Sequence, residues 1–483
     1  MAIQITYQYQ GPPSKRILLF ETKFDIVVVG SGSGMNVAAN AVDHGLKVAV
    51  VERGLWGGTC LNHGCIPSKM LIFLADVLAM MKEADKLGVH AKVGSIDFRS
   101  IMRRTREHVR KERESLEHSA MHHPAFMWYK ETGEFVGDYT LKVGNDKIKG
   151  EMIFIASGTR PIIPRIPGIN KVPCLTNETI FALDDRPERM VIVGGGFMGV
   201  EFAHFFSSMG TDVTVLEMGP RLVAQEEPEI SQLLLEEMAK TTQVLVNHRV
   251  ERLDQDGTTK KVTARDLVKD SITELKADAI LMALGRVSNA DMLHPERTGV
   301  GTDDRGFIKV NEYLETTKPK IWAFGDAIGV HMYRHAANYE SSVAWANAQL
   351  QLGHENGRTR KTPVDFSAVP HAVYSHPEIG SVGLTEWEAR NKGHDIMVGR
   401  WDYANTASGV AMGEPTGFVK VVVEKKTLKI LGCHVIGHCA PVLVQEAINV
   451  MNCRQGSAMD IINSMHIHPS LTEVVLNAFD NLG

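Results

Sequence analysis

Cysteine is scarce in this chain, with only six among 483 residues. Small secreted domains that depend on disulfides carry a far higher density of cysteine, so a disulfide scaffold is excluded. Neither sign of charge is in large excess, because 52 Lys and Arg face 57 Asp and Glu. The resulting net charge of −5 gives no reason to expect a nucleic-acid partner.

Long hydrophobic runs are also missing, since no uninterrupted apolar stretch approaches the roughly 20 residues of a membrane helix. Residues 1–22 contain Gln, Tyr, Pro and Lys without the apolar core of a signal peptide, which predicts an N-terminal extension. We therefore expect a cytoplasmic protein with no membrane partner. In that reducing compartment a disulfide would be catalytic.

Glycine, in contrast, is abundant, with 43 residues. Several glycines form a turn between a strand and a helix near the start of the chain. Residues 24–29 form a strand-like run, the glycine-rich turn 30–34 follows, and a helix over 36–44 leads to a strand over 47–51. This order, ending at Glu52, is typical of a dinucleotide-binding unit. The glycines let backbone amides approach a pyrophosphate, and Glu52 can bind a ribose. The usual third glycine is replaced by Met35, which predicts a helix standing slightly off the sheet.

A second unit of the same kind begins at Arg189. A strand over 190–193 leads into the full glycine motif 194–199, and a later strand over 212–216 closes on Glu217. Two units imply two dinucleotides bound at once, so electrons can pass from one to the other. Glu217 would pair with a ribose 2′-hydroxyl and repel a 2′-phosphate, which favours NAD over NADP. Arg221 nearby could in principle meet a phosphate.

Two of the cysteines, Cys60 and Cys65, lie just ahead of a helix-forming run over 69–87. If the helix begins near Cys60, the two sulfurs lie about one turn apart, within reach of a disulfide. Unpaired amides at a helix N-terminus also favour a thiolate. The spacing therefore predicts a redox pair that opens and closes without backbone movement.

The length predicts about three domains, and from residue 367 the pattern becomes antiparallel, with strands over 369–374, 417–423 and 430–436 and helices over 440–451 and 458–465. We therefore expect an α/β protein with two Rossmann-like domains and a C-terminal α+β dimerisation domain, the latter after a polar linker at 353–361. The expected segments are an extension at 1–22, an FAD domain at 23–160 and 289–361, an NAD domain at 161–288, and an interface domain at 362–483.

Together these motifs resemble those of the FAD-dependent pyridine nucleotide-disulfide oxidoreductases, over nearly the whole chain from Phe24. The resemblance rests on Gly57 to Lys69 with both cysteines, on Ala283-Leu284-Gly285-Arg286, on Ala323-Phe324-Gly325-Asp326, and on His468-Pro469 with Glu473. It implies FAD in the first unit, the nicotinamide cofactor NAD in the second, and a homodimer whose active site is shared between chains.

The resemblance also implies roles for individual residues. Cys65 would be the flavin-side sulfur and Cys60 the sulfur that exchanges with substrate, with Lys69 beside the flavin and paired with Glu201. His468 of the partner subunit would be the acid-base group, oriented by Glu473, with His466 as the competing histidine. The implied FAD residues are Gly30, Gly32, Gly34, Glu52, Gly58, Thr59, Lys69, Gly158, Asp326 and His335. The implied NAD residues are Gly194, Gly196, Gly199, Glu217 and Gly285.

The family contains several activities, and the sequence leaves two open. Glu217 and the run 64–69 favour dihydrolipoyl dehydrogenase, acting on a small dithiol or a lipoyl-carrying protein. Residues 201–204 and 285–291, together with Met35, are closer to mycothione reductase, which reduces a low-molecular-weight disulfide. A flavin-binding protein without catalysis is a third reading. We expect no metal site, and interpret the Cys and His residues at 433–439 as core packing.

Overall fold

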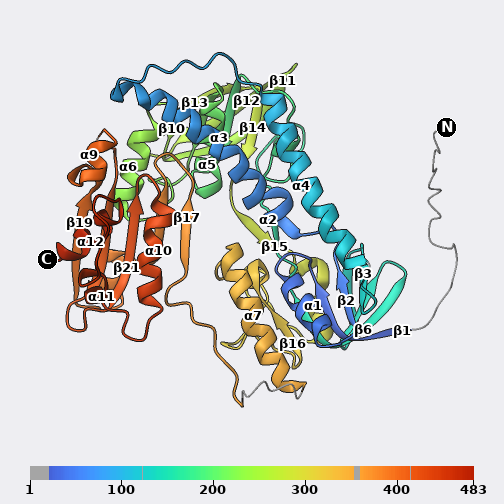
Figure 1. Cartoon of the computed structure of the whole chain (residues 1–483). Coiled ribbons are helices and arrows are strands. Elements are labelled where there is room, and N and C mark those ends of the chain that lie inside the picture. The colour runs from blue at the N-terminus through green and yellow to red at the C-terminus, as the bar shows by residue number, and fades with distance from the viewer. Residues whose placement is uncertain (1–20, 122, 353–358, 414) are drawn as a thin grey trace, which may run out of the picture.

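The computed structural model describes residues 21–121, 123–352, 359–413 and 415–483. Figure 1 shows three groups of elements, with the first sheet and α7 at the lower right, the second dinucleotide-binding unit above them, and the C-terminal domain on the left. Most of the expected extension at 1–22 and of the linker at 353–361 lies outside the described residues. The predicted fold class, two dinucleotide-binding units and a dimerisation-type domain, is confirmed.

The first sheet is parallel at its centre because its strands are short β-branched runs that are buried on both faces. Its order is β3-β2-β1-β6-β5-β4, and β16 pairs with the free side of β6 although it lies far along the chain. The strands are β1 (Glu21–Val29), β2 (Val48–Val51), β3 (Phe126–Tyr129), β4 (Gly133–Gly137), β5 (Thr140–Val143), β6 (Asp146–Ile155) and β16 (Ile321–Ala323). The helices of this part are α1 (Gly34–Asp43), α4 (Phe98–Met121) and α7 (Arg334–Gln351).

The second unit has its own parallel sheet, in the order β10-β9-β8-β14, and an antiparallel meander that the sequence pattern did not predict. Its parallel strands are β8 (Arg189–Val193), β9 (Asp212–Leu216), β10 (Gln243–Leu245) and β14 (Ala279–Met282). The meander consists of β11 (His248–Asp256), β12 (Thr259–Asp266) and β13 (Ile272–Ala277). The helices are α5 (Phe197–Ser208) and α6 (Pro228–Met238), and a short ribbon, β7 (Thr159–Pro161) with β15 (Arg286–Ser288), joins the two units.

The C-terminal domain is a five-stranded antiparallel sheet, in the order β17-β18-β21-β20-β19, packed against helices. Its predicted strand over 430–436 and helix over 440–451 match the structure. The strands are β17 (Pro370–Val373), β18 (Ile379–Gly383), β19 (Ile396–Asp402), β20 (Phe418–Glu424) and β21 (Ile430–Ile436). The helices are α8 (Glu386–Asn391), α9 (Ala407–Ala411), α10 (Ala440–Met451), α11 (Ala458–Ile462) and α12 (Thr472–Asp480).

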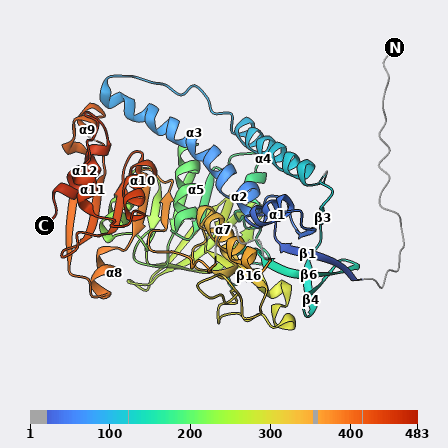
Figure 2. The ribbon, with the colours of Figure 1, turned by 60° about the horizontal axis from the view of Figure 1, so that its bottom comes forward.

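The cysteines lie on two helices instead of one. Cys60 is in α2 (Gly58–His63), and Cys65 is the first residue of α3 (Cys65–Glu83). The chain breaks between them at Gly64, whose φ of −142° and ψ of −120° are not helical. Figure 2 shows α3 and α4 along one side of the molecule. The break puts Cys65 at a helix N-terminus, where unpaired backbone N–H groups favour a thiolate.

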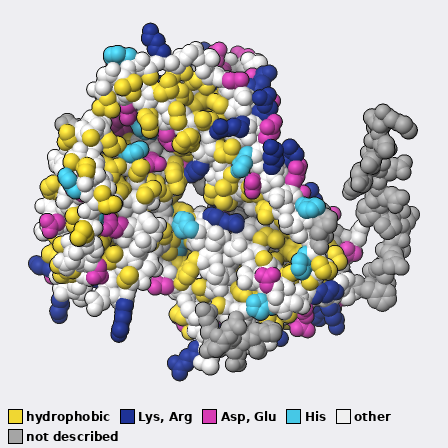
Figure 3. Space-filling view, in the orientation of Figure 1, with side chains coloured by type: hydrophobic (Ala, Val, Ile, Leu, Met, Phe, Trp, Pro, Cys, Tyr) yellow, Lys and Arg dark blue, Asp and Glu magenta, His cyan; other side chains and the backbone are white. Residues whose placement is uncertain are grey.

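One stretch, 58–87, is long and apolar enough to cross a membrane by length and composition alone. Polar contacts interrupt it, since Lys69 pairs with Glu201 and Asp76 with His204, both on α5. Its outward stripe of Ile66, Phe73, Val77 and Met80 is exposed, and Figure 3 shows apolar side chains gathered over this part of the molecule. A single helix of this kind also occurs in proteins that never enter a bilayer, so it is weak evidence for a membrane span.

The second unit and the C-terminal domain are joined by a buried lysine. Lys420 on β20 is 4% exposed and lies 3.0 Å from Glu227, 2.9 Å from Glu229 and 2.9 Å from Glu386. Although burial opposes it, hydrogen bonds to Glu229 and Glu386 raise the pKa of Lys420. The lysine therefore holds a group of carboxylates that would otherwise repel one another.

We expect Lys420→Met to destabilise the protein, because it leaves these carboxylates without their cation. Removing one partner of a buried ionic group costs about 3–5 kcal/mol, which lowers Tm by several degrees. Thermal denaturation followed by circular dichroism measures the shift. Lys426→Met, at an exposed position beyond the end of the same strand, is the control and should leave Tm unchanged. Equal Tm values for the two variants would contradict this account.

Candidate active site

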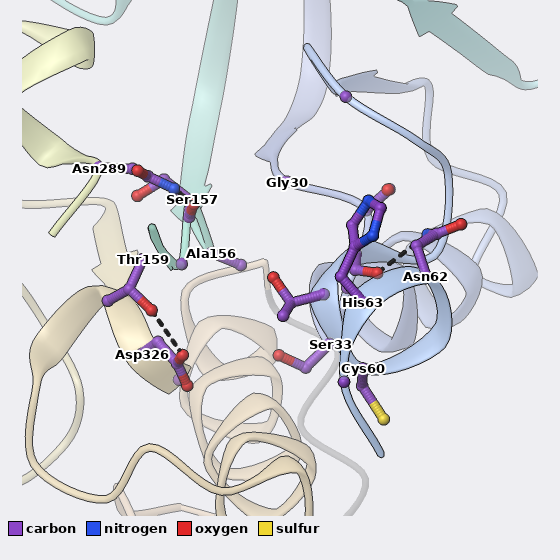
Figure 4. Close-up of a pocket in the computed structure, with 18 of the residues that line it drawn as sticks. Gly30, Ser33, Cys60, Asn62, His63, Ala156, Ser157, Thr159, Asn289 and Asp326 are labelled. Atoms are coloured by element: carbon purple, nitrogen blue, oxygen red, sulfur yellow. Dashed lines mark hydrogen bonds between the residues drawn. The ribbon is translucent and has the colours of Figure 1, made fainter. Parts of the chain in front are cut away.

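A cavity of about 730 Å³ opens where the first sheet, α2, α3 and the start of α7 meet. Figure 3 shows the molecule hollowed near its centre, with basic side chains beside the hollow. In Figure 4 the labelled residues surround this space, with Thr159, Ser157 and Asn289 on one side and Cys60, Asn62 and His63 on the other. A volume of this size is typical of a site for a cofactor or drug-sized molecule.

The first glycine loop forms one end of the cavity. Gly30 has a φ of +105°, and a Cβ there would lie 2.2 Å from the carbonyl oxygen of Ala156, so only glycine fits. Glu52 closes the loop, because one carboxylate oxygen accepts hydrogen bonds from the backbone N–H of Ser31 (2.9 Å) and from its hydroxyl (2.8 Å). The loop thus leaves bare backbone at the N-terminal end of α1, as pyrophosphate binding requires.

The second glycine loop repeats this geometry outside the cavity. Gly194 has a φ of +112°, and Glu217 accepts hydrogen bonds from the backbone N–H of Gly195 (2.7 Å) and of Gly219 (2.6 Å). Arg221, the residue that could have met a phosphate, donates instead to the carbonyl of Ala224 at 3.1 Å. The two units therefore present the same arrangement of acidic residue and loop, which supports binding of two dinucleotides.

The third glycine differs between the units. A Cβ on Gly199 would lie 1.9 Å from the carbonyl oxygen of Gly194, so that position admits no side chain. In the first unit the close approach of α1 to β1 is made at Gly34, where a Cβ would lie 2.7 Å from Val28. Met35 is half-buried and packs beside the core of the first sheet. A side chain at residue 35 is therefore compatible with close packing one residue earlier.

The residues of the cavity fit a flavin dinucleotide. The hydroxyl of Ser157 is buried and makes no hydrogen bond within the described part of the chain. Asp326, at the end of β16, accepts a hydrogen bond from Thr159 at 2.8 Å, drawn in Figure 4, and one of its edges faces the cavity. Gly58 lies so near Gly32 that a Cβ would come within 2.8 Å of the Gly32 Cα. Gly158 and Thr59 also line the space.

Both cysteines line this cavity as free thiols. The hydrogen bond from the Cys60 thiol is the main reason that the pKa of Cys65 falls to about 7, and the positive charge of Lys69 adds to it against the effect of burial. The same hydrogen bond, together with burial, raises the pKa of Cys60. The pair is therefore asymmetric, with a thiolate at Cys65 and a protonated thiol at Cys60 near neutral pH.

Lys69 is held in place by two contacts. Its ammonium lies 2.6 Å from the carboxylate of Glu201 on α5 and 4.4 Å from the ring centre of Tyr374, just after β17. Glu201 also accepts a hydrogen bond from the backbone N–H of Tyr374 at 3.0 Å. The pairing of Lys69 with Glu201 that the resemblance implied is thus present, and it fixes a cation near the Cys65 sulfur.

One of the implied FAD residues lies elsewhere than the resemblance implied. His335 is exposed, with its ring 2.7 Å from the carbonyl oxygen of Pro370, and it does not line the cavity. Because α7 begins at Arg334, the residues one turn apart on its inner face are Arg334 and Ala337, and these line the cavity instead. The Arg334 charge acts on both cysteines. A search for basic residues at the start of this helix would have found it.

His63, which had no role from the sequence, lines the cavity beside Asn62 (Figure 4). Its backbone carbonyl accepts a hydrogen bond from the side chain of Asn177 at 3.0 Å. Burial lowers the pKa of the His63 ring, and Arg113 and Arg286 add to the effect against the charge of Glu178. The imidazole is therefore neutral and forms part of the cavity wall.

The two C-terminal histidines have contrasting surroundings. His468 is 72% exposed, and its ring lies 2.8 Å from Glu473, whose pKa the hydrogen bond lowers. His466 is 7% exposed and paired with Glu446 at 2.8 Å. Exposed Met465 and Ile467 flank His466. Of the two histidines, His468 is the one that a second molecule could reach.

A dithiol beside one dinucleotide cavity, with a second dinucleotide loop in the same chain, defines a class of redox enzymes that pass electrons between thiols and nicotinamide. Comparison with known families identifies the family within this class. The model described as pyridine nucleotide-disulphide oxidoreductase matches residues 24–349, and that of its dimerisation domain matches residues 369–479. The chain belongs to this family, whose members use FAD and NAD(P)H.

The relatives of known activity include both activities that the sequence left open, and a mercuric reductase of Lysinibacillus sphaericus is 30% identical over 88% of this chain and 76% of that protein. The chain is 31% identical to dihydrolipoyl dehydrogenase of Chlamydia muridarum, over 93% of this chain and 95% of that protein. It is 33% identical to mycothione reductase of Mycobacterium tuberculosis, over 94% and 98%. Among solved structures it is similar to the HOCl-induced flavoprotein disulfide reductase RclA from Escherichia coli, with a TM-score of 0.82, 28% identity, and coverage of 94% and 99%. The family is thus established, and the identities do not separate the two activities.

The lowered pKa of Cys65 predicts the pH dependence of its reactivity. In the reduced protein, alkylation of Cys65 by iodoacetamide should be half-maximal near pH 7 and fall at lower pH as the thiolate is protonated. Lys69→Met should raise that midpoint by roughly one unit, because it removes an attracting charge. Mass spectrometry of the alkylated peptide measures it. Lys82→Met, exposed at the far end of α3, should leave the midpoint unchanged, and a shift there would contradict a local effect of Lys69.

Proposed function

We propose that this protein is an NAD-linked dithiol–disulfide oxidoreductase of the dihydrolipoyl dehydrogenase type. The observation that carries the proposal is the asymmetric pair of Cys60 and Cys65, with Cys65 at the N-terminus of α3 beside Lys69 and facing the dinucleotide cavity. Such a pair suits two-electron exchange, because the sulfur with the lower pKa is the better leaving group and the other is the one left for the substrate to attack.

The thiol chemistry follows from these positions. A substrate thiolate attacks the Sγ of Cys60 in the oxidised pair, the Cys60–Cys65 bond breaks, and Cys65 leaves as a thiolate stabilised by Lys69. The second substrate thiol then attacks the substrate sulfur bound to Cys60, which closes the substrate disulfide and releases Cys60. His468 of the partner subunit takes the proton from the attacking thiol, and Glu473 orients its ring. Two electrons thereby pass from substrate to the cysteine pair.

FAD, when bound, relays these two electrons between the thiols and a nicotinamide. The residues proposed to hold it are the Gly30–Gly34 loop, Glu52, Gly58, Thr59, Gly158 and Asp326. The proposed residues for the nicotinamide cofactor are Gly194, Gly196, Gly199, Glu217 and Gly285. We exclude His335 from the first group because its ring faces Pro370.

The contacts of Glu217 support NAD as the preferred nicotinamide. Its carboxylate closes the second loop at the position that corresponds to Glu52 in the first, where a ribose 2′-phosphate would meet negative charge. Arg221 is turned toward its own loop and offers no charge to that phosphate. In the cytoplasm that we propose as its compartment, this protein would then work against the NAD pool.

Reduction of a low-molecular-weight disulfide such as mycothione is the second candidate. The mycothione reductase identity of 33% and the segment Glu201 to His204 favour it. A panel of dihydrolipoamide with NAD, and mycothione, glutathione and coenzyme A disulfides with NADH, decides between them. Rapid turnover of dihydrolipoamide supports our proposal, whereas NADH-dependent turnover of one of these disulfides without dihydrolipoamide activity replaces it with the second candidate.

Changes at Glu217 test the nicotinamide preference. We expect Glu217→Ala to lower kcat/KM for NAD(H) by about 10-fold or more, because a charge-assisted hydrogen bond to the ribose contributes about 1.5–3 kcal/mol. The advantage over NADP(H) should shrink at the same time. Arg221→Ala should change neither value by more than about twofold, given the contact of Arg221 with Ala224. Faster turnover with NADPH in the unmodified protein would refute the assignment.

Mixed dimers test whether the active site is shared between chains. Cys60→Ser and His468→Gln homodimers should each lose activity, by about 10²-fold or more for the histidine change. After unfolding and refolding the two together, about half of the dimers are mixed, and each has one site with both residues intact, so about a quarter of the activity should return. A site built within one chain would give no recovery.

A further inference from the structure

Away from the cysteines, two histidines and an aspartate from three separate elements converge on one point. Asp76 lies on α3, His204 on α5, and His376 in the segment between β17 and β18. One nitrogen or oxygen atom from each lies within 4.8 Å of the others. Nothing in the sequence suggested this group, and no step of the proposed thiol chemistry uses it.

The distances suit a metal ion with small adjustment. Nε2 of His204 already lies 2.8 Å from Oδ1 of Asp76, and the imidazoles of His204 and His376 stack with centres 5.3 Å apart and planes 14° from parallel. Ligand atoms bound at 2.0–2.1 Å in a tetrahedral set are about 3.3 Å apart. His376 would therefore move inward by about 1.5 Å at most, measured from the 4.8 Å limit, and its ring would turn out of the stack so that its in-plane nitrogen lone pair faces the ion. Its side chain is 42% exposed, which leaves room for that shift.

Charge and access favour a cation at this point. Besides Asp76, the carboxylate of Glu83 lies 2.8 Å from Nε2 of His376, and Glu378 is close enough to feel the charges of both Asp76 and His376. The group therefore brings three carboxylates and two imidazoles together, with the cations Lys86 and Lys240 close enough to act on Glu83. Asp76 and Glu83 are partly exposed, so an ion can enter from solvent. Imidazole with carboxylate suits Zn²⁺ and its neighbours in the transition series better than Mg²⁺ or Ca²⁺.

We propose that Asp76, His204 and His376 bind a divalent transition-metal ion such as Zn²⁺, with Glu83 or water in the fourth position. Sequence reasoning expected no metal site. Metal sites are visible in a sequence when their ligands lie close together in the chain. Asp76, His204 and His376 come from three distant segments that only the fold brings together.

The location gives the ion a structural role near the active site. The same three segments also meet at Lys69, Glu201 and Tyr374 beside Cys65. Asp76 is two helical turns beyond Lys69 on α3, and His204 is one turn beyond Glu201 on α5. A bound ion would therefore cross-link α3, α5 and the segment after β17 at a point farther from the cysteines. The same three segments hold Lys69 next to the cysteine pair.

Binding of Zn²⁺ alone to the full-length, FAD-containing dimer tests the site, in a Cys60→Ser, Cys65→Ser background that removes thiol ligands. We expect one Zn²⁺ per chain by isothermal titration calorimetry, with a dissociation constant of about 10 µM or tighter, and a visible Co²⁺ spectrum typical of nitrogen and oxygen ligands. His204→Gln and His376→Gln should each weaken Zn²⁺ binding at least about 30-fold. Zn²⁺ should raise Tm in the parent and not in these variants.

The matched control is His394→Gln, which removes another histidine paired with a carboxylate, Glu424, a pair that belongs to no group of three such ligands among the described residues. It should bind Zn²⁺ like the parent. If His204→Gln fails to fold, as judged by its flavin spectrum, the more exposed His376→Gln decides alone. The proposal is overturned if the parent shows no saturable binding below about 1 mM Zn²⁺, or if both histidine variants bind as tightly as the parent.

Discussion

The contact between Lys69 and Glu201 is the interaction on which the arrangement of the active site depends. Lys69 is one turn into the helix that begins with Cys65, and Glu201 lies on the first helix of the second dinucleotide unit. Tyr374, from the C-terminal domain, completes the contact through its backbone and its ring. All three parts of the chain therefore meet beside the reactive sulfur, which interacts electrostatically with both Lys69 and Tyr374. Displacement of any one of these parts would change the electrostatic environment of the Cys65 sulfur.

The two dinucleotide units show how one local design tolerates different sequences. In both, a strand delivers a glutamate that accepts backbone N–H groups of the glycine loop, at Glu52 and at Glu217. The units differ where the helix approaches the strand. Gly199 is pressed against a backbone carbonyl and admits nothing larger, whereas the first helix makes its closest approach at Gly34 and leaves residue 35 free to be Met. The requirement for glycine applies where the helix and the strand come closest in space. The position of a residue within the sequence motif does not by itself show where that contact lies.

The same distinction explains what could and could not be predicted from the sequence. Motifs that are continuous in the chain, such as the two glycine loops and the cysteine pair, were visible because their chemistry depends on neighbours a few residues away. The meander β11–β13 was missed because its strands are half exposed and lack a long apolar run. His335, implied by the resemblance alone, does not line the cavity, because its ring lies against the carbonyl of Pro370 while Arg334 and Ala337 occupy the inner face of α7. The cluster of Asp76, His204 and His376 depends on contacts between segments far apart, which no local pattern contains.

The exposure of His468 has a consequence for how the protein behaves at low concentration. In the single chain its imidazole faces solvent, although its carboxylate partner is already in place and its neighbour His466 is buried. If the acid-base group reaches the cysteines only across a subunit boundary, each chain carries the cysteines of one site and the histidine of the other. An isolated chain then has no complete site. Catalytic capacity then obeys mass action: it disappears on dilution below the dissociation constant of the dimer and returns on concentration, with no change in the fold of either chain.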